Sequence, residues 1–178
     1  NVIALLLKRR APVNAISQSG TPLDLAKGYR QPEAAALLQA KRGRAGREVS
    51  IHMAAAKGDA IAVQAFIIRR GIKVNTPGPL HKSTPLHWAA GAGKVNTMET
   101  LISLGADVDA LSDSEATPLH QAVLQHHPEA VKLLIRSNAD LNSQNKSGYT
   151  PLDYATANGW ADLAELLQTA GAVPGKSL

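Results

Sequence analysis

The sequence contains no cysteine among its 178 residues, which excludes disulfide frameworks, cysteine-ligated zinc sites and thiol nucleophiles. Aromatic residues make up only 3% of the chain, so a core has to be built from Ala, Leu, Ile and Val, a composition that favours helices. The longest uninterrupted apolar runs, Val2–Leu7 and Ala34–Leu38, fall far short of the roughly 18 residues needed to span a bilayer. We therefore expect no membrane insertion.

Charged residues are also sparse, and they are unevenly placed. They make up 19% of the chain against 44% hydrophobic residues, so the chain is able to bury a core and does not have the composition of a disordered tail. Residues 1–82 hold 14 Lys/Arg and 4 Asp/Glu, whereas residues 83–178 hold 5 and 10. The chain begins at Asn1, inside an apolar stretch and without an initiator methionine, and we interpret it as a fragment of a longer protein.

The most informative feature that is present is an internal repeat. The tripeptide Thr-Pro-Leu begins at Thr21, Thr84, Thr117 and Thr150, and the last three copies start 33 residues apart. A fifth, degraded copy begins at Val49. The fourth place of each copy is His or Asp, and the sixth place is Ala, at Ala26, Ala54, Ala89, Ala122 and Ala155. Five alanines in register indicate a repeat architecture.

Each repeat predicts two short helices and a loop. In the copy at Thr84, the threonine caps a first helix and Pro85 occupies its first turn, where the missing N–H costs nothing. A second helix begins near Asn96 and ends at Gly105, which suits the left-handed conformation that follows a helix; Asn138 takes this place in the next copy. The loop that follows is rich in turn-forming residues and predicts a hairpin-like connection. Because helices this short are marginal alone, the repeats have to stack into a solenoid.

These residues resemble the ankyrin repeat, whose signature begins Thr-Pro-Leu-His-x-Ala and whose period is 33 residues. The match includes Thr84–Ala89 and continues at Gly105–Ala110, which is similar to the loop sequence of that family. The resemblance implies an all-α fold, an ankyrin-repeat solenoid of helix-turn-helix units with β-hairpin-like connecting loops. It predicts a single ankyrin-repeat domain over residues 1–178, with a truncated N-terminal repeat 1–20 and repeats 21–48, 49–83, 84–116, 117–149 and 150–178.

Two of these repeats depart from the 33-residue period. Repeat 21–48 is short, and its loop is replaced by the basic run Lys41–Arg47. Repeat 49–83 has 35 residues. We predict that its second helix is swollen by one residue and that its loop at Thr76–Lys82 is enlarged.

The sequence predicts no catalytic, cofactor-binding or metal-binding residues. His52, His87 and His120 occupy one repeat position, and stacked repeats place them about a helix diameter apart, too far for a shared ion. The resemblance implies that each of these histidines instead bonds the Thr hydroxyl and neighbouring backbone. The segment Gly171–Ser177 lacks the spacing and the following helix of a phosphate loop. No other catalytic signature is present, so we do not expect an enzyme.

The resemblance implies a non-catalytic protein-protein interaction module that binds a partner protein on a concave face formed by hairpin tips and first helices. We expect an intracellular, cytoplasmic protein that is a monomer in isolation. The candidate partner-binding residues are those at the tips and helix ends that the repeat pattern does not dictate: Leu80, His81, Lys82, Ser112, Asp113, Glu115, Leu124, Gln125, Gln144, Lys146, Tyr149 and Asn158.

Two other functions stay open at this point. The basic N-terminal half, with the run Lys41–Arg47, is compatible with binding to nucleic acid or to an acidic surface. The absence of aromatic side chains within that run disfavours nucleic acid. The chain is also compatible with a regulatory ankyrin segment of a longer enzyme or channel. The identity of the partner does not follow from the sequence.

Overall fold

The computed structural model describes residues 50–78 and 81–175. The chain divides into two units, Asn1–Ser50 and Ile51–Leu178. The predicted repeats 1–20 and 21–48, the basic run 41–47 and the candidate residue Leu80 lie outside the described residues. The single domain over residues 1–178 therefore stays a prediction.

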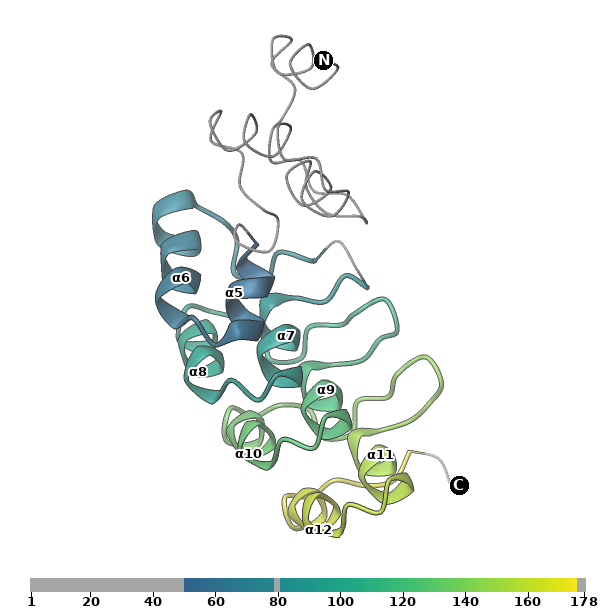
Figure 1. Ribbon diagram of the computed structural model, residues 1–178. Helices are drawn as coiled ribbons and strands as arrows, with labels where there is room; N and C mark the ends of the chain where they lie inside the picture. Colours follow the sequence, from purple (N-terminus) through teal and green to yellow (C-terminus); the bar gives the residue numbers. More distant parts are fainter. Residues whose placement is uncertain (1–49, 79–80, 176–178) are drawn as a thin grey trace, which may run out of the picture. The chain divides into compact units, whose positions relative to one another are not determined.

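The described part of the second unit consists of helix pairs joined by loops (Figure 1). The pairs are α5 (Ile51–Lys57) with α6 (Ala60–Gln64) and the π-helical segment η1 (Ala65–Arg69), α7 (Pro85–Gly91) with α8 (Val95–Ser103), α9 (Pro118–Leu124) with α10 (Pro128–Arg136), and α11 (Pro151–Ala157) with α12 (Ala161–Thr169). No strand occurs among the residues that the structure describes. The predicted all-α fold is confirmed. No described helix has both the length and the apolar character that crossing a bilayer requires.

The predicted start and stop signals have the expected geometry. Thr117 and Thr150 have extended backbones and begin α9 and α11 with capping boxes, and a proline follows each in the first turn. The second helices end before residues with positive φ, among them Gly105 at 87° and Asn138 at 59°. Asn138 therefore replaces a glycine in the left-handed conformation, as the sequence predicts.

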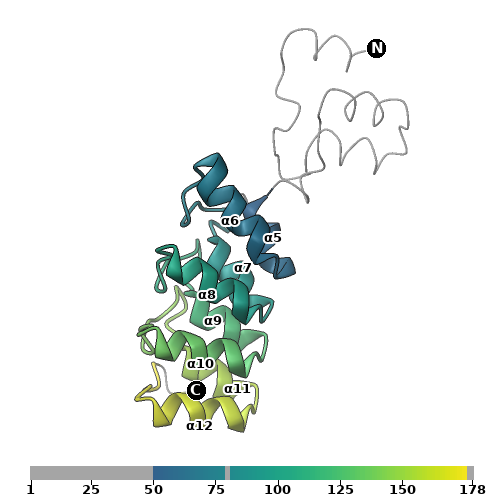
Figure 2. The same cartoon turned by 90° about the vertical axis from the view of Figure 1, so that its left-hand side faces the viewer.

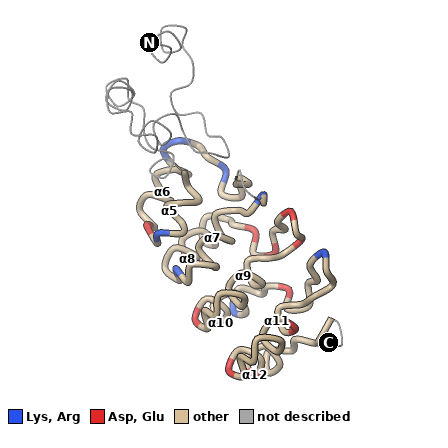
Figure 3. Tube along the Cα trace, turned by 45° about the vertical axis from the view of Figure 1, so that its right-hand side comes forward, with Lys and Arg blue, Asp and Glu red and all other residues tan. Residues whose placement is uncertain are grey.

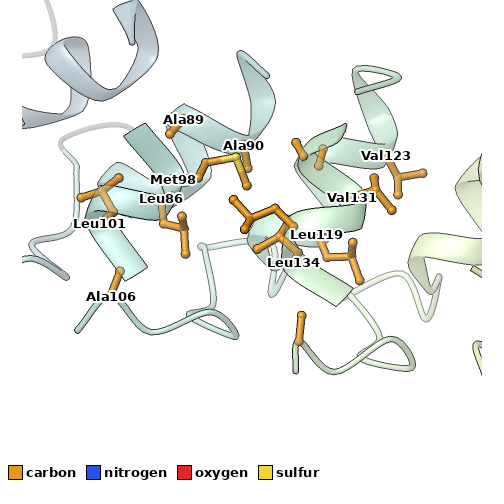
Figure 4. Close-up of a cluster of buried hydrophobic side chains, with 14 of the residues drawn as sticks. Leu86, Ala89, Ala90, Met98, Leu101, Ala106, Leu119, Val123, Val131 and Leu134 are labelled. Carbon is orange, nitrogen blue, oxygen red and sulfur yellow. The ribbon is translucent and has the colours of Figure 1, made fainter. Parts of the chain in front are cut away.

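Within this unit the helices form two layers. The first helices α5, α7, α9 and α11 follow one another in one layer, and α6, α8, α10 and α12 follow in the second (Figures 1 and 2). Fully buried leucines from both layers fill the space between them, including Leu86 and Leu101 in one repeat and Leu119 and Leu134 in the next (Figure 4). The alanines at the sixth repeat position are buried as well: Ala54, Ala89, Ala122 and Ala155. Small side chains there let the first helices approach closely.

The extra residue predicted in the second helix of repeat 49–83 is accommodated by η1. The N–H of Ile72 donates to the carbonyl of Phe66, six residues back, whereas in the next repeat Ala106 N–H donates to Leu101 O, five residues back. A π-helical turn absorbs one additional residue without ending the helix. The predicted swelling is therefore confirmed.

The connecting loops form turns that are closed by backbone hydrogen bonds. Ser112 N–H donates to Ala116 O (3.1 Å), and Asn145 N–H donates to Tyr149 O (3.0 Å). The loops also join to each other: Lys146 N–H donates to Ser114 O of the preceding loop (2.9 Å). The loops are hairpin-like in this sense, and they run as a row beside the first helices (Figure 1).

Candidate functional site

The histidines at the fourth repeat position fix the loops against the first helices. Nδ1 of His87 accepts from the Thr84 backbone N–H (3.1 Å) and lies 2.9 Å from the Thr84 hydroxyl oxygen. Because a backbone N–H can only donate, Nδ1 has to be the acceptor and the proton lies on Nε2. Nε2 then donates to the carbonyl oxygen of Ala116 in the next loop, at 2.9 Å. The role implied for this histidine is confirmed.

Burial controls the charge of these histidines. Removal from water lowers the pKa of His52, His87 and His120, and hydrogen bonds to the carbonyl groups of Thr76, Ala116 and Tyr149 oppose it more weakly. The three imidazoles are therefore held neutral and act as fixed donors and acceptors. Among the described residues, no group of three His, Asp or Glu side chains is placed to hold a metal ion.

The last repeat uses a carboxylate in place of the histidine. Asp153 Oδ2 accepts from the Thr150 backbone N–H (2.7 Å) and hydroxyl (3.0 Å), and also from the Gly175 N–H (3.1 Å). Histidine donates to a carbonyl of the next loop, whereas aspartate accepts from an N–H of the segment that follows α12. Both side chains connect a first helix to the chain beyond its own repeat.

A hollow opens between the first helices and the loops. Its volume is about 670 Å³, which is within the range of ligand-binding pockets. We name it the Trp88 pocket. Its lining residues come from α5, α7, α9 and two successive loops: Ala56, His81, Ser83, His87, Trp88, Gly91, Ala92, Ser112, Ser114, Gln121 and Gln125.

Small side chains on α7 explain why the hollow is there. Gly91 and Ala92 occupy the positions that hold Leu124 and Gln125 one repeat later. The Leu124 side chain is exposed. With little or no side chain at Gly91 and Ala92, the half-buried Trp88 lines the hollow beside them.

The hydroxyl groups and side-chain amides of the pocket differ in whether they make hydrogen bonds within the protein. Ser112 is buried, and its Oγ accepts from the Ala116 N–H (3.2 Å) and lies 3.0 Å from Ser114 Oγ. In contrast, the side-chain amides of Gln121 and Gln125 make no hydrogen bond with any described residue. These two amides are available to a ligand.

Several of the predicted partner-binding residues lie in or beside the Trp88 pocket. His81, Ser112 and Gln125 line the pocket. Lys82 and Asp113 stand next to lining residues in the sequence, are exposed, and form an ion pair of 3.1 Å. Such an exposed pair contributes little to stability. Glu115, Gln144, Lys146 and Asn158 are exposed at the loops and at the end of α11.

Tyr149 belongs to a second group of side chains, at the loop before α11. Its ring is half-buried and lies 5.9 Å from the ring of Tyr154, measured between centroids. The Tyr154 hydroxyl accepts from Asn145 Nδ2 (2.8 Å), and Asn145 Oδ1 accepts from the Tyr149 N–H (3.2 Å). Asn145 was not among the predicted residues, although it fixes the backbone of this loop.

Sequence reasoning also missed Trp88, Gly91, Ala92, Ser83, Ser114 and Gln121 as site residues. The signal that points to them is a comparison of the same position across repeats. Positions 88, 121 and 154 hold Trp, Gln and Tyr, and positions 91, 124 and 157 hold Gly, Leu and Ala. The pairing of Trp at position 88 with Gly at position 91 is the difference between repeats that could have pointed to this hollow.

At the turn between α9 and α10, the exposed side chain of His126 contacts the next repeat. His126 has φ of 52°, in a position where the neighbouring repeats have Gly93 and Gly159. Its Nε2 lies 3.1 Å from Oδ1 of Asp162 in the next repeat, and its ring lies 5.0 Å from the ring of Trp160. This hydrogen bond lowers the pKa of Asp162. Both side chains are open to water, so the contact is screened.

The charge asymmetry of the sequence continues in this unit. Basic residues occur on η1 and the loop after it, whereas acidic residues predominate from α8 to α12 (Figure 3). The described residues after 82 therefore do not form a basic surface of the kind that binds nucleic acid.

Comparisons with known proteins agree with the repeat architecture. A family model described as ankyrin repeats (3 copies) matches residues 51–145 and 107–176, which together exceed half of the chain. The palmitoyltransferases ZDHHC13 of Pongo abelii and Homo sapiens are each 36% identical to this chain over 44 residues, which is 25% of the chain and 7% of each relative. The match thus spans only a small part of these curated relatives. The family match, the paired helices and the bridging histidines together show that the chain belongs to the ankyrin repeat family.

Proposed function

We propose that this chain is a non-catalytic protein-protein interaction module that binds its partner on the face formed by the loop tips and the first helices. Ankyrin repeats generally mediate protein-protein interaction. The observation that carries the proposal is the Trp88 pocket, which lies on that face and is lined largely by side chains that the repeat pattern does not dictate.

The scaffold supports binding because it is fixed before a partner arrives. His87 and His120 fasten successive loops to the first helices through their Nε2 donors, at 2.9 and 3.1 Å. Loops that are already ordered lose little conformational entropy on association. The binding free energy is then available for contact with the partner.

Two side chains outside the pocket are candidate anchors. Tyr149 presents an aromatic ring at a loop, and Leu124 exposes an apolar side chain at the end of α9. Anchors of this kind, surrounded by polar residues, often dominate the free energy of an interface. We expect Tyr149→Ala and Leu124→Ala each to weaken partner binding by at least about 1 kcal/mol without unfolding the array.

The experiment begins with affinity capture on residues 1–178 and mass spectrometry to identify a partner, followed by calorimetric titration of the purified pair. Ile61→Ala is the matched control, because Ile61 is an exposed apolar residue of α6 in the other helical layer. A partner whose affinity falls only when Arg42, Arg44 and Arg47 are replaced would overturn the proposal. Steep loss of that binding with added salt would then favour nucleic acid or another acidic surface.

A second candidate is a regulatory ankyrin segment of a longer enzyme or channel. The partial match to palmitoyltransferases is the observation that favours it, although the matched region is short. Immunodetection of the natural protein with an antibody against residues 84–178 tests it. A mass well above 18.7 kDa supports this role, and a mass near that value opposes it.

The proposal includes a monomeric state in isolation and a cytoplasmic location. Light scattering coupled to size-exclusion chromatography measures the first, and a mass of 18.7 kDa for residues 1–178 is expected. Fractionation of the source cells with the same antibody measures the second.

A further inference from the structure

Among the residues that the structure describes, the lining of the Trp88 pocket contains no Asp, Glu, Lys or Arg. The charged neighbours in the sequence, Lys82 and Asp113, pair with each other at 3.1 Å. His87 is held neutral, because its Nδ1 accepts from a backbone N–H and burial lowers its pKa. A charged group that entered this pocket would lose hydration and would meet no Asp, Glu, Lys or Arg among the described lining residues, which is unfavourable.

Two free amides stand on one wall of the pocket. Gln121 and Gln125 are four residues apart at the end of α9, so they share one face of the helix and lie about 5–6 Å apart at Cβ. In an extended chain, backbone groups that point to the same side repeat about every 6.6 Å, which is twice the rise per residue. Each glutamine amide carries both a donor and an acceptor, as a peptide group does.

Part of the pocket lining is apolar. We name its small residues Ala56, Gly91 and Ala92 the floor, and the Trp88 ring adds to the apolar lining. A Cβ atom added at Gly91 would lie 3.7 Å from Oε1 of Gln121, so the amide wall and the floor are close together. One side chain of a bound segment is thus able to lie on the floor while its backbone faces the amides.

We infer that the Trp88 pocket selects an extended segment of a partner protein that carries an apolar side chain for the floor and no charged side chain beside it. This inference rests on the proposed function and specifies the ligand of that same face. Gln121 and Gln125 bind peptide groups of the segment, and the uncharged lining rejects acidic and basic residues. Specificity therefore comes in part from exclusion.

The test is a selection of phage-displayed random dodecapeptides on immobilised residues 1–178. Enriched peptides are expected to share an aliphatic or aromatic residue flanked by uncharged residues. Peptides enriched in Asp, Glu, Lys or Arg at the shared positions would overturn the inference, as would a selection that enriches no peptide.

The variant that locates the binding is Gly91→Leu. Gly91 has no positive φ, and its new Cβ would make only ordinary contacts, so we expect the fold to persist while the side chain fills the pocket. Binding of a selected synthetic peptide should weaken at least about tenfold. Ala157→Leu is the matched control at the equivalent, exposed position of α11, which is not part of the pocket lining, and it should leave affinity unchanged.

A charge-reversal arm tests the chemistry of the lining. Repeating the selection on Gln121→Glu should enrich peptides with Lys or Arg next to the apolar residue, because the new carboxylate supplies a counter-ion. An unchanged peptide pattern would show that Gln121 does not face the ligand and would overturn its assigned role. Fluorescence of Trp88, measured in a Trp160→Phe background, reports binding at the pocket directly.

These outcomes separate the inference from the proposed function. If selected peptides depend on Tyr149 and Leu124 but not on Gly91→Leu, the face binds peptides while the pocket does not, and only the inference fails. If no variant of this face changes the binding of either peptides or a partner, both fail.

Discussion

The imidazole of His120 reaches 29 residues along the sequence to bond Tyr149. Its Nε2 lies 3.1 Å from the Tyr149 carbonyl oxygen, while its Nδ1 accepts from the Thr117 backbone N–H at 3.1 Å. One neutral ring thus accepts a hydrogen bond from the backbone N–H at the start of its own helix and donates one to the next loop. Protonation of Nδ1 would place two donors against each other, so this connection requires the neutral form.

Stability should fall in mild acid for this reason. Burial lowers the pKa of His52, His87 and His120. Above the unfolded pKa of about 6.5 both states are neutral and stability is complete. As pH falls below that value the unfolded chain takes up protons first, so the free energy of unfolding decreases. Urea titrations between pH 7.5 and pH 5 should show this decrease.

The slope of that pH dependence identifies the groups. His87→Asn should reduce the slope, because one titrating side chain is removed, whatever its effect on absolute stability. Gln144→Asn replaces an exposed side chain that does not titrate and should leave the slope unchanged. If the pH dependence of the unfolding free energy stays the same when each buried histidine is replaced in turn, other groups cause it.

The alanines at the sixth repeat position give a second prediction. Ala89 and Ala122 have no exposed surface and lie where first helices pack together. Ala89→Leu or Ala122→Leu should lower the free energy of unfolding by about 1 to 3 kcal/mol, because the added carbons have no space. Ala157→Leu on the exposed end of α11 is the control. Equal denaturation midpoints for all three variants would contradict close packing at this position.

The repeats are also joined by a row of side-chain to backbone bonds at the loops. Asp109 Oδ1 accepts from the Asp140 N–H at 2.9 Å, and Asn75 and Asn142 make the same bond to Asp107 and Val173. Asp109→Ala should cost about 0.5 to 1.5 kcal/mol of stability. Asp109→Asn should retain most of it, since asparagine serves at the two equivalent places. Similar losses for both variants, measured by urea unfolding, would contradict this bond as the cause.

Local chemistry made much of this fold predictable from the sequence. Thr84 followed by Pro85 specifies a helix start, and Asn138 or Gly105 specifies its end, because each rule depends on a few adjacent backbone groups. The extra residue of repeat 49–83 was evident from the longer distance between the repeat starts. It forms the π-helical segment η1 because Phe66 is kept in the core. The helix starts and ends needed no knowledge of the neighbouring repeats, whereas the extra residue was found by comparison with their period.

The pocket was not predictable in the same way. It depends on Ala56, Gly91 and Ala92 being small at places that meet only after stacking. Ser112 is predicted as a partner-binding tip residue and lines the pocket, but it is buried and its hydroxyl accepts from the Ala116 N–H. A serine in a tight turn often satisfies its own backbone, so variability alone did not reveal which tip residues face outward.

The last prediction concerns Glu115, which has φ of 57° although it is not a glycine. One repeat later the equivalent residue is Gly148, with φ of 79°. A left-handed conformation costs a residue with a side chain about 1 to 2 kcal/mol, whereas glycine loses about 0.5 to 1 kcal/mol more in backbone entropy on folding. Glu115→Gly should therefore raise the free energy of unfolding by about 0.5 to 1 kcal/mol.

Gly148→Ala is the reciprocal variant and should destabilise the array by about 1 kcal/mol. Both are measured by urea unfolding at pH 7.5, where the buried histidines do not titrate. Because Glu115 is exposed, its replacement removes no buried contact, and a change in stability reports the backbone alone. Destabilisation by Glu115→Gly would mean that the carboxylate contributes more to this loop than the left-handed backbone costs.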